Sequence, residues 1–148
     1  MLMVATIGCD RVTKRMAADF LGEAAPRSFM NDTVRFQYAE NTGGFLGLGA
    51  GWPAEARTAV FVVGNGLLLI GAIVFAIRSR WSGTALVGSA LFVAGGASNL
   101  ADRIARGSVV DFMILSLGPW RTGIFNVADM AIMLGMALVA RSFWGRAR

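Results

Sequence analysis

Residues 58–77, TAVFVVGNGLLLIGAIVFAI, contain no charged side chain, and only Thr58 and Asn65 are polar. A helix needs about 20 mostly apolar residues to cross the hydrocarbon core of a bilayer. This stretch therefore predicts a membrane-spanning helix. It also indicates the fold class of the chain, an all-α membrane protein.

Two further stretches have the same character. Residues 82–101 are free of charge and rich in small side chains, and residues 124–143 begin with an apolar run that holds Asp129. The whole chain is 55% hydrophobic and 16% charged, whereas soluble domains carry about 25% charged residues. A soluble bundle of three buried helices is the alternative, but the chain has too little polar surface to cover one.

The N-terminal 22 residues predict a fourth span. A signal peptide would carry its basic residues before the apolar run, but here the first nine residues are apolar and the charges follow. At 100° per residue, the charged side chains from position 10 to position 15 share one face. We therefore expect a helix over residues 1–22 with a polar inward side formed by Asp10, Arg11, Lys14 and Arg15.

The distribution of basic residues predicts the orientation in the membrane. Arg78 and Arg80 lie between the second and third predicted spans, and Arg141, Arg146 and Arg148 lie near the C-terminus. Positive residues mark cytoplasmic ends, so both termini are expected in the cytoplasm. These residues are scattered at span ends and not clustered with aromatic side chains, so a nucleic-acid partner is not expected.

The remaining sizeable segment, residues 23–57, is expected to lie outside the membrane. Residues 33–40 alternate apolar with polar side chains, and this period of two predicts a short strand. The glycine-rich stretch that follows predicts a turn or an adaptable loop. We expect one membrane domain over residues 1–148.

The chain contains no histidine. This excludes nucleophilic Ser–His and Cys–His pairs and most zinc sites, and neither a metal nor a cofactor is expected. Proton chemistry would then depend on carboxylates, Lys14, Tyr38 or bound water. Ionisable residues inside a membrane protein usually line a functional site, so each is a candidate.

Asp111 and Asp129 stand in apolar surroundings, eighteen residues apart. Two carboxylates that face each other cannot both ionise cheaply, so one would hold a proton while the other acts as a base on water, and they would titrate as a coupled pair. Ion pairs with Arg103 or Arg121 are the structural alternative.

The third span ends in polar residues. Asn99, Asp102 and Arg103 share one helical face, which fits either a functional site or a polar helix end with a local ion pair. Before them, Gly95 and Gly96 would let a neighbouring helix pack closely.

Four sequence blocks occur in order: DRVTK (10–14), NTGGF (41–45), GGASNLADR (95–103) with VVDF (109–112), and FNVAD (125–129). Together they resemble the bacterial lipoprotein signal peptidases, the signal peptidase II family. The last two blocks are long, ordered and unusual inside a membrane protein, and the resemblance extends over most of the chain.

The resemblance implies a four-helix aspartic endopeptidase of the bacterial inner membrane, with a small β-cradle on the periplasmic face and no cofactor. Its partners would be membrane lipids and prolipoproteins, cleaved just before the diacylglyceryl-modified cysteine. Asp111 and Asp129 match the catalytic dyad. The matches to residues that support the site or bind substrate are Asp10, Lys14, Asn41, Gly43, Asn99, Arg103 and Asn126.

Two features depart from the family pattern. In NTGGF, Phe45 stands one position earlier than usual, which bears on how the loop grips substrate and on specificity. Only nine residues precede Asp10, so either the chain lacks some N-terminal residues or its first helix starts at the membrane surface.

Two other functions remain open at this point. A small proton-coupled transporter would use the buried aspartates as a proton relay, although it would predict paired halves and the chain has no internal repeat. A family paralogue with altered specificity is the second, and the shifted loop is its only support.

Overall fold

The computed structural model describes residues 1–144, so the predicted basic residues Arg146 and Arg148 lie outside the described part. The elements in chain order are α1 (Leu2–Leu21), β1 (Arg27–Phe29), β2 (Val34–Asn41), the 3₁₀ turn η1 (Phe45–Gly47), α2 (Ala54–Arg57), the π-helical segment η2 (Thr58–Gly64), α3 (Asn65–Arg78), α4 (Gly83–Arg106), β3 (Val109–Leu117), β4 (Trp120–Arg121) and α5 (Val127–Trp144).

Within residues 1–144, three helices are long and apolar enough to cross a membrane: Ala54–Arg78, Gly83–Arg106 and Val127–Trp144. They correspond to the predicted spans 58–77, 82–101 and 124–143, with shifted ends. The second continues past residue 101 because its polar last turn is still helical, and it ends at Gly107, whose φ of 74° is the left-handed cap that glycine adopts readily.

The N-terminal segment forms the 20-residue helix α1, which is about 30 Å long. Asp10 and Lys14 are buried against the other helices as predicted. The prediction was wrong for Arg11 and Arg15, whose side chains are exposed. A step of 100° moves each of them to the edge of the buried face.

A four-stranded antiparallel sheet lies at one end of the bundle, with the order β1-β2-β3-β4. Strand β2 confirms the strand predicted at 33–40, displaced by one residue. Strand β3 was not predicted, because its first four residues are all buried and therefore lack the alternation that marks a half-exposed strand. In the register, Asn41 lies opposite Val109, and Ala39 lies opposite Asp111.

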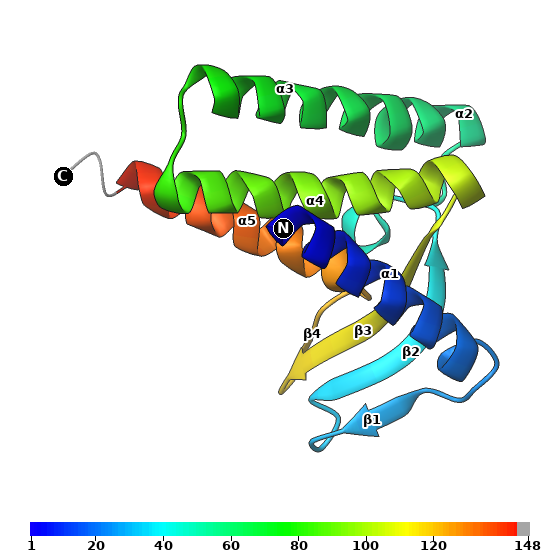
Figure 1. The fold of residues 1–148 in the computed structure, drawn as a ribbon. Helices are drawn as coiled ribbons and strands as arrows, with labels where there is room; N and C mark the ends of the chain where they lie inside the picture. The colour runs from blue at the N-terminus through cyan, green and yellow to red at the C-terminus, as the bar shows by residue number, and fades with distance from the viewer. Residues whose placement is uncertain (145–148) are drawn as a thin grey trace.

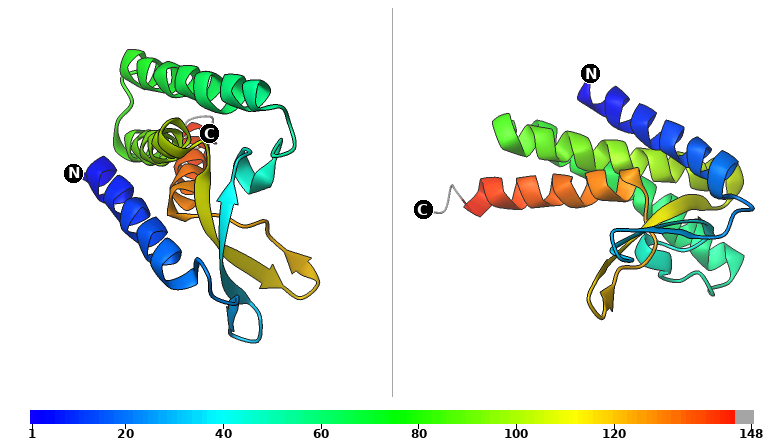
Figure 2. Two further views of the ribbon diagram at one scale, coloured as in Figure 1. Left: turned by 90° about the vertical axis from the view of Figure 1, so that its right-hand side faces the viewer. Right: turned by 90° about the horizontal axis from the view of Figure 1, so that it is seen from below.

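Helix α4 is the centre of the bundle and packs against α1, α3 and α5. Figure 1 shows the sheet at one end of the bundle and the α3–α4 connection at the other, and Figure 2 shows α1 and α3 on different sides of α4. The predicted close packing at Gly95 and Gly96 is confirmed. A Cβ on Gly95 would collide with the carbonyl of Ala128, and one on Gly96 would lie 2.6 Å from Leu69 of α3.

Candidate active site

The predicted site residues meet at the sheet end of the bundle, where α1, α4, α5 and β3 come together. All are buried except Arg103, which is partly exposed; the buried ones are Asp10, Lys14, Asn41, Gly43, Asn99, Asp111, Asn126 and Asp129. They come from five separate parts of the chain. The fold therefore collects them into one cluster.

Asp129 is fixed at the start of α5 by a reciprocal pair of hydrogen bonds. Its backbone N–H donates to Asn126 Oδ1 at 2.9 Å, and the backbone N–H of Asn126 donates to Asp129 Oδ2 at 3.2 Å. This is a capping box, which satisfies two N–H groups at the helix start. The other carboxylate oxygen accepts from Asn99 Nδ2 at 2.9 Å. The helix dipole favours negative charge at this position.

Asp111 is held in a similar way from two sides. Its Oδ1 accepts from Asn126 Nδ2 at 2.6 Å and its Oδ2 accepts from Asn41 Nδ2 at 2.9 Å. Asn126 therefore contacts both aspartates, through its amide on one side and its backbone on the other. The two aspartates are thus linked through one residue.

The two aspartates differ from the other buried carboxylates in their ion pairing. Within residues 1–144, no ion pair reaches Asp111 or Asp129, so the predicted alternative of ion pairs with Arg103 or Arg121 is wrong. Arg121 pairs instead with Asp32 at 2.7 Å on the sheet. Burial raises the pKa of Asp111, and its hydrogen bonds from Asn41 and Asn126 oppose that rise. This carboxyl group therefore keeps its proton to a higher pH than an exposed aspartate does.

Lys14 is the buried cation of the cluster, with only 3% of its side chain exposed. Its Nζ lies 2.7 Å from Asp10 Oδ2, 2.8 Å from Asp102 Oδ2 and 2.8 Å from Asn99 Oδ1. An ammonium group has three donors, so all three are used. The bond to Asn99 also fixes the orientation of that amide, because an oxygen held by Lys14 leaves the Nδ2 group to face Asp129.

Asp10 connects α1 to the start of α5. Its Oδ1 accepts from the backbone N–H of Ala128 at 2.8 Å, and its Oδ2 also accepts from Ser98 Oγ at 2.7 Å. Because the first N–H groups of a helix have no partner inside it, Asp10 caps α5 across the bundle. It holds the backbone next to Asp129 in place.

The NTGGF loop closes the site from the sheet side. Asn41 Oδ1 accepts from the N–H of Gly43 at 2.9 Å, while the Gly43 carbonyl accepts from Arg103 Nη2 at 2.6 Å. A side chain at position 43 has no room, because a Cβ there would lie 2.5 Å from the Leu48 carbonyl oxygen. Asn41 thus links the loop to Asp111, and Gly43 links it to α4.

Asn99, Asp102 and Arg103 all lie on α4, but they do not share one partner. Asp102 points to Lys14 on α1, whereas Arg103 points to the loop and donates back to the Asn99 carbonyl at 3.4 Å. Three residues at spacings of three and four cover a wide sector of a helix. The sector is wide enough here to reach two different partners.

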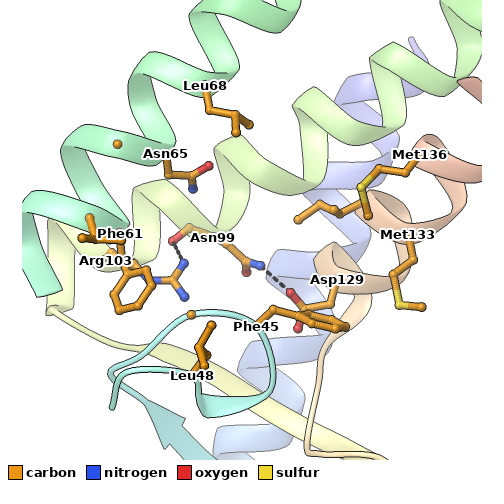
Figure 3. A pocket seen from close by; sticks show the side chains of 14 residues that line it. Phe45, Leu48, Phe61, Asn65, Leu68, Asn99, Arg103, Asp129, Met133 and Met136 are labelled. Carbon is orange, nitrogen blue, oxygen red and sulfur yellow. Dashed lines mark hydrogen bonds between the residues drawn. The ribbon is translucent and has the colours of Figure 1, made fainter. Parts of the chain in front are cut away.

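A pocket of about 540 Å³ opens beside Asp129, a volume typical of small-molecule sites. Asn65, Asn99, Arg103 and Asp129 are its polar and charged lining side chains (Figure 3). The rest of the lining is apolar or glycine: Gly44, Phe45, Leu48, Val60, Phe61, Gly64, Leu68, Ile132, Met133 and Met136. Asp111 does not line this pocket.

Sequence reasoning missed the aromatic support of the loop. Trp52 stacks on Phe61 with the ring centroids 5.9 Å apart, and the Arg103 guanidinium lies 5.7 Å from the centroid of the same ring. Phe61 belongs to the π-helical segment η2, an irregularity that is frequent at functional sites. No local pattern marks it, because Phe61 stands in an apolar run like any lipid-facing residue.

Sequence reasoning missed Ser98, and it named Asp102 only as part of the polar end of the third span. Asp102 is 1% exposed and Ser98 is buried, and both contact the buried cluster around Lys14. The i, i+3 and i, i+4 spacing of Ser98, Asp102 and Asn99 on one helix was the available signal. It shows a shared face but not the partner on α1.

The family model described as "Signal peptidase (SPase) II" matches residues 2–144. The chain belongs to the signal peptidase II family. It is 34% identical over 138 residues to a lipoprotein signal peptidase of Chlorobium phaeobacteroides, covering 88% of this chain and 80% of that relative. A relative of the same name from Hydrogenovibrio crunogenus is 33% identical over 152 residues, covering 99% and 86%.

Solved structures share the fold. A bacterial membrane enzyme superposes with a TM-score of 0.86 at 23% identity, covering 99% of this chain and 87% of the other, and a second such structure gives 0.83 at 23% identity, covering 96% and 89%. The chain thus has the function of a signal peptidase II, which is a protease of lipoprotein processing. Nothing in these relationships supports the transporter alternative.

Proposed function

We propose that Asp111 and Asp129 are the catalytic dyad of an aspartic endopeptidase. The observation that carries this proposal is a pair of buried carboxyl groups next to an apolar pocket. Among the described residues, neutral amides hold these groups and no cation pairs with them. A cation would keep both groups ionised, whereas amides leave the pair free to share one proton.

The ionised carboxylate takes a proton from a water molecule, whose oxygen attacks the scissile carbonyl carbon. The protonated partner donates its proton to the carbonyl oxygen as the tetrahedral intermediate forms. When the intermediate collapses, one of its hydroxyl groups returns a proton to the dyad as the C=O bond re-forms. The C–N bond breaks, and the leaving amine takes up the proton that the dyad first removed from water. Such general acid–base catalysis needs neither histidine nor metal.

The supporting residues divide into three roles. Asn99 and Asn126 hold the two carboxyl groups at hydrogen-bond distance. Asp10 and Lys14 act through others, Asp10 by capping α5 and Lys14 by orienting the Asn99 amide. The loop contacts of Asn41, Gly43 and Arg103 close the site and present the substrate backbone.

The substrate is a prolipoprotein that is cut just before its diacylglyceryl-modified cysteine. Its apolar signal peptide and acyl chains suit the pocket, whose lining is mostly apolar on the α3 and α5 sides. Phe45 of the shifted loop lines this pocket and is 46% exposed. We assign it a direct contact with substrate, so that the loop departure tunes specificity and leaves the chemistry intact.

The enzyme spans the inner membrane four times, with the sheet outside and both termini in the cytoplasm. Helix α1 is long enough to cross, and it exposes Val4, Val12 and Phe20 where lipid would contact it. The α3–α4 connection and the C-terminal end of α5 lie at the bundle end opposite the sheet (Figure 1). Arg78 ends α3, Arg80 lies in the connection and Arg141 lies in the last turn of α5, and basic residues mark a cytoplasmic end. Alkaline phosphatase inserted after Asp32 is expected to be active, and fused at Met1 or after Trp144 to be inactive; the reverse pattern would contradict this orientation.

The decisive test of the chemistry compares two peptides with a lipoprotein signal sequence, one carrying the diacylglyceryl cysteine and one the free cysteine. We expect the wild type to cut only the lipidated peptide. Asp111→Asn and Asp129→Asn are expected to fold and to lose cleavage. Asp32→Asn is the matched control, because it alters an exposed aspartate in the turn between β1 and β2 and should retain activity. Substantial turnover by either dyad variant would overturn the assignment.

A further inference from the structure

A second hollow lies between α1 and α4 and shares no lining residue with the pocket beside Asp129. It has a volume of about 490 Å³ and is lined by Arg11, Val12, Lys14, Arg15, Met16, Ala18, Asp19, Asp102 and Arg106. We call it the α1–α4 groove. Four of its side chains are basic and two are acidic, so it carries excess positive charge.

Two guanidinium groups in this groove are positioned by one carboxylate. Arg11 Nη1 lies 3.1 Å and Arg106 Nη2 lies 2.9 Å from the same oxygen, Asp102 Oδ1. The two arginines come from different helices, and their side chains are 46% and 48% exposed. Asp102 therefore brings two guanidinium groups together without neutralising both, because its other oxygen is already paired with Lys14.

Arg15 adds a third guanidinium group to the groove. It is exposed, lines the groove, and forms no ion pair with any residue from 1 to 144. Preorganised guanidinium groups that keep free N–H donors are suited to phosphate, which they bind through paired hydrogen bonds. The dyad chemistry proposed above uses none of the three.

The surroundings of the groove indicate a lipid as the source of the phosphate. Val12 and Met16 line it and are more than half exposed, so apolar side chains flank the basic ones. Helix α4 has 24 residues and is about 36 Å long, which exceeds a hydrocarbon core of about 30 Å. Its last turn, which carries Asp102 and Arg106, therefore falls at the level of the lipid headgroups.

We propose that the α1–α4 groove binds the headgroup phosphate of an anionic phospholipid. The phosphate would contact arginines of both helices and so connect α1 to α4 on the lipid-facing surface of the bundle. This inference rests on the membrane placement in the proposed function. The bound lipid stabilises the buried contact between Lys14 and Asp102. Lys14 also donates to Asn99, and Asn99 donates to Asp129, so the groove is connected to the dyad by hydrogen bonds.

The test uses the full chain in nanodiscs of phosphatidylcholine, with and without phosphatidylglycerol. In native mass spectrometry, we expect the wild-type protein to retain phosphatidylglycerol in preference to phosphatidylcholine. This preference should decrease at high salt. Arg15→Gln, which removes an exposed side chain without an ion pair, should weaken retention about fivefold, and Arg15→Gln with Arg106→Gln should weaken it further. Arg141→Gln, at the far end of α5, is the matched control.

The other arms separate the possible outcomes. Inorganic phosphate added to phosphatidylcholine discs should not raise the unfolding temperature; a rise equal to that from phosphatidylglycerol would assign the groove to a free anion and overturn the lipid. Equal retention by the wild type and the double variant would also overturn the proposal. Peptidase activity in zwitterionic micelles is measured in parallel, so failure of the dyad and failure of the groove are distinguishable.

Discussion

The protein has two groups of buried carboxylates, which are connected through the side chain of Asn99. The groups differ in the partners that their oxygens have. Asp10 and Asp102 are paired with Lys14 at 2.7 and 2.8 Å, and Asp102 is also paired with two arginines. Asp111 and Asp129 accept hydrogen bonds only from amide groups within residues 1–144. We call these the ion-paired group and the amide-held group.

The difference separates a structural task from a chemical one. A carboxylate next to a buried cation fixes geometry, because removing either partner would leave the other charge unpaired. A carboxyl group held by neutral amides can gain or lose a proton without leaving a buried cation unpaired. Asn99 joins the groups, since Lys14 donates to its oxygen and its nitrogen donates to Asp129.

The largest expected effect is on catalysis by the amide-held group. Asp129→Asn keeps the size of the side chain and one of its two accepted hydrogen bonds, but it cannot exchange the proton. The catalytic rate constant should fall by about 10²–10⁴-fold, the usual contribution of general acid–base catalysis. Steady-state kinetics on a diacylglyceryl peptide measure this fall. Equal activity of the variant and the wild type would remove the distinction between the two groups.

The ion-paired group should instead respond in stability. Lys14→Met leaves the carboxylates of Asp10 and Asp102 without their shared cation, and breaking a buried ion pair in this way costs about 3–5 kcal/mol. We expect a large fall in unfolding temperature in detergent. Arg15→Gln, one residue along the same helix, serves as the control and should unfold like the wild type. A Lys14→Met protein of wild-type stability would show that the cluster is not structural.

Asn99→Ala should lower activity less than the loss of an aspartate. It removes one donor to a carboxylate, a bond of about 1.5–3 kcal/mol, so the catalytic rate constant is expected to fall roughly 10–100-fold with a smaller change in KM.

The double variant Lys14→Met/Asn99→Ala tests whether Lys14 acts through Asn99. If it does, the double variant should be scarcely less active than Asn99→Ala at a temperature where both are folded. Fully additive losses would show that Lys14 affects the dyad by another route.

The smallest effect is a pH dependence of stability. The pKa of Asp111 is raised by burial in the folded protein, so the folded state binds more protons than the unfolded state above the ordinary aspartate pKa of about 3.9. Stability from this group is thus complete at acid pH and is lost as pH rises through the raised pKa. Asp111→Asn should match the wild type near pH 3 and become the more stable protein toward pH 7 in unfolding measurements. A constant difference across this range would contradict the sign.

Much of the architecture was predictable because membrane helices have to be long and apolar. Long apolar stretches are stable as helices in the hydrocarbon core of a bilayer. The structure is helical at all three such stretches, around residues 58–77, 82–101 and 124–143. Strand β3 was not predictable, because a strand buried on both faces has the same local pattern as an apolar helix or an interfacial segment.

The candidate site was predictable as a set of residue types and not as a set of contacts. Polar side chains such as Asn99 and Asp129 stand out in an apolar chain because their burial is costly. Their partners are far away in sequence: Asp10 caps a helix 118 residues later, and Asn41 reaches Asp111 over 70 residues. Local periodicity carries no information at such separations.

The sequence by itself determined that the chain has long apolar helices, that its proton chemistry falls to carboxylates, and which aspartates are candidates. These properties follow from composition and from the cost of burying charge. Only the tertiary structure decided which carboxylates meet a cation and which meet amides. Helix α1 brings Lys14 to Asp102, whereas β2 brings Asn41 to Asp111, and that assignment depends on which elements pack side by side.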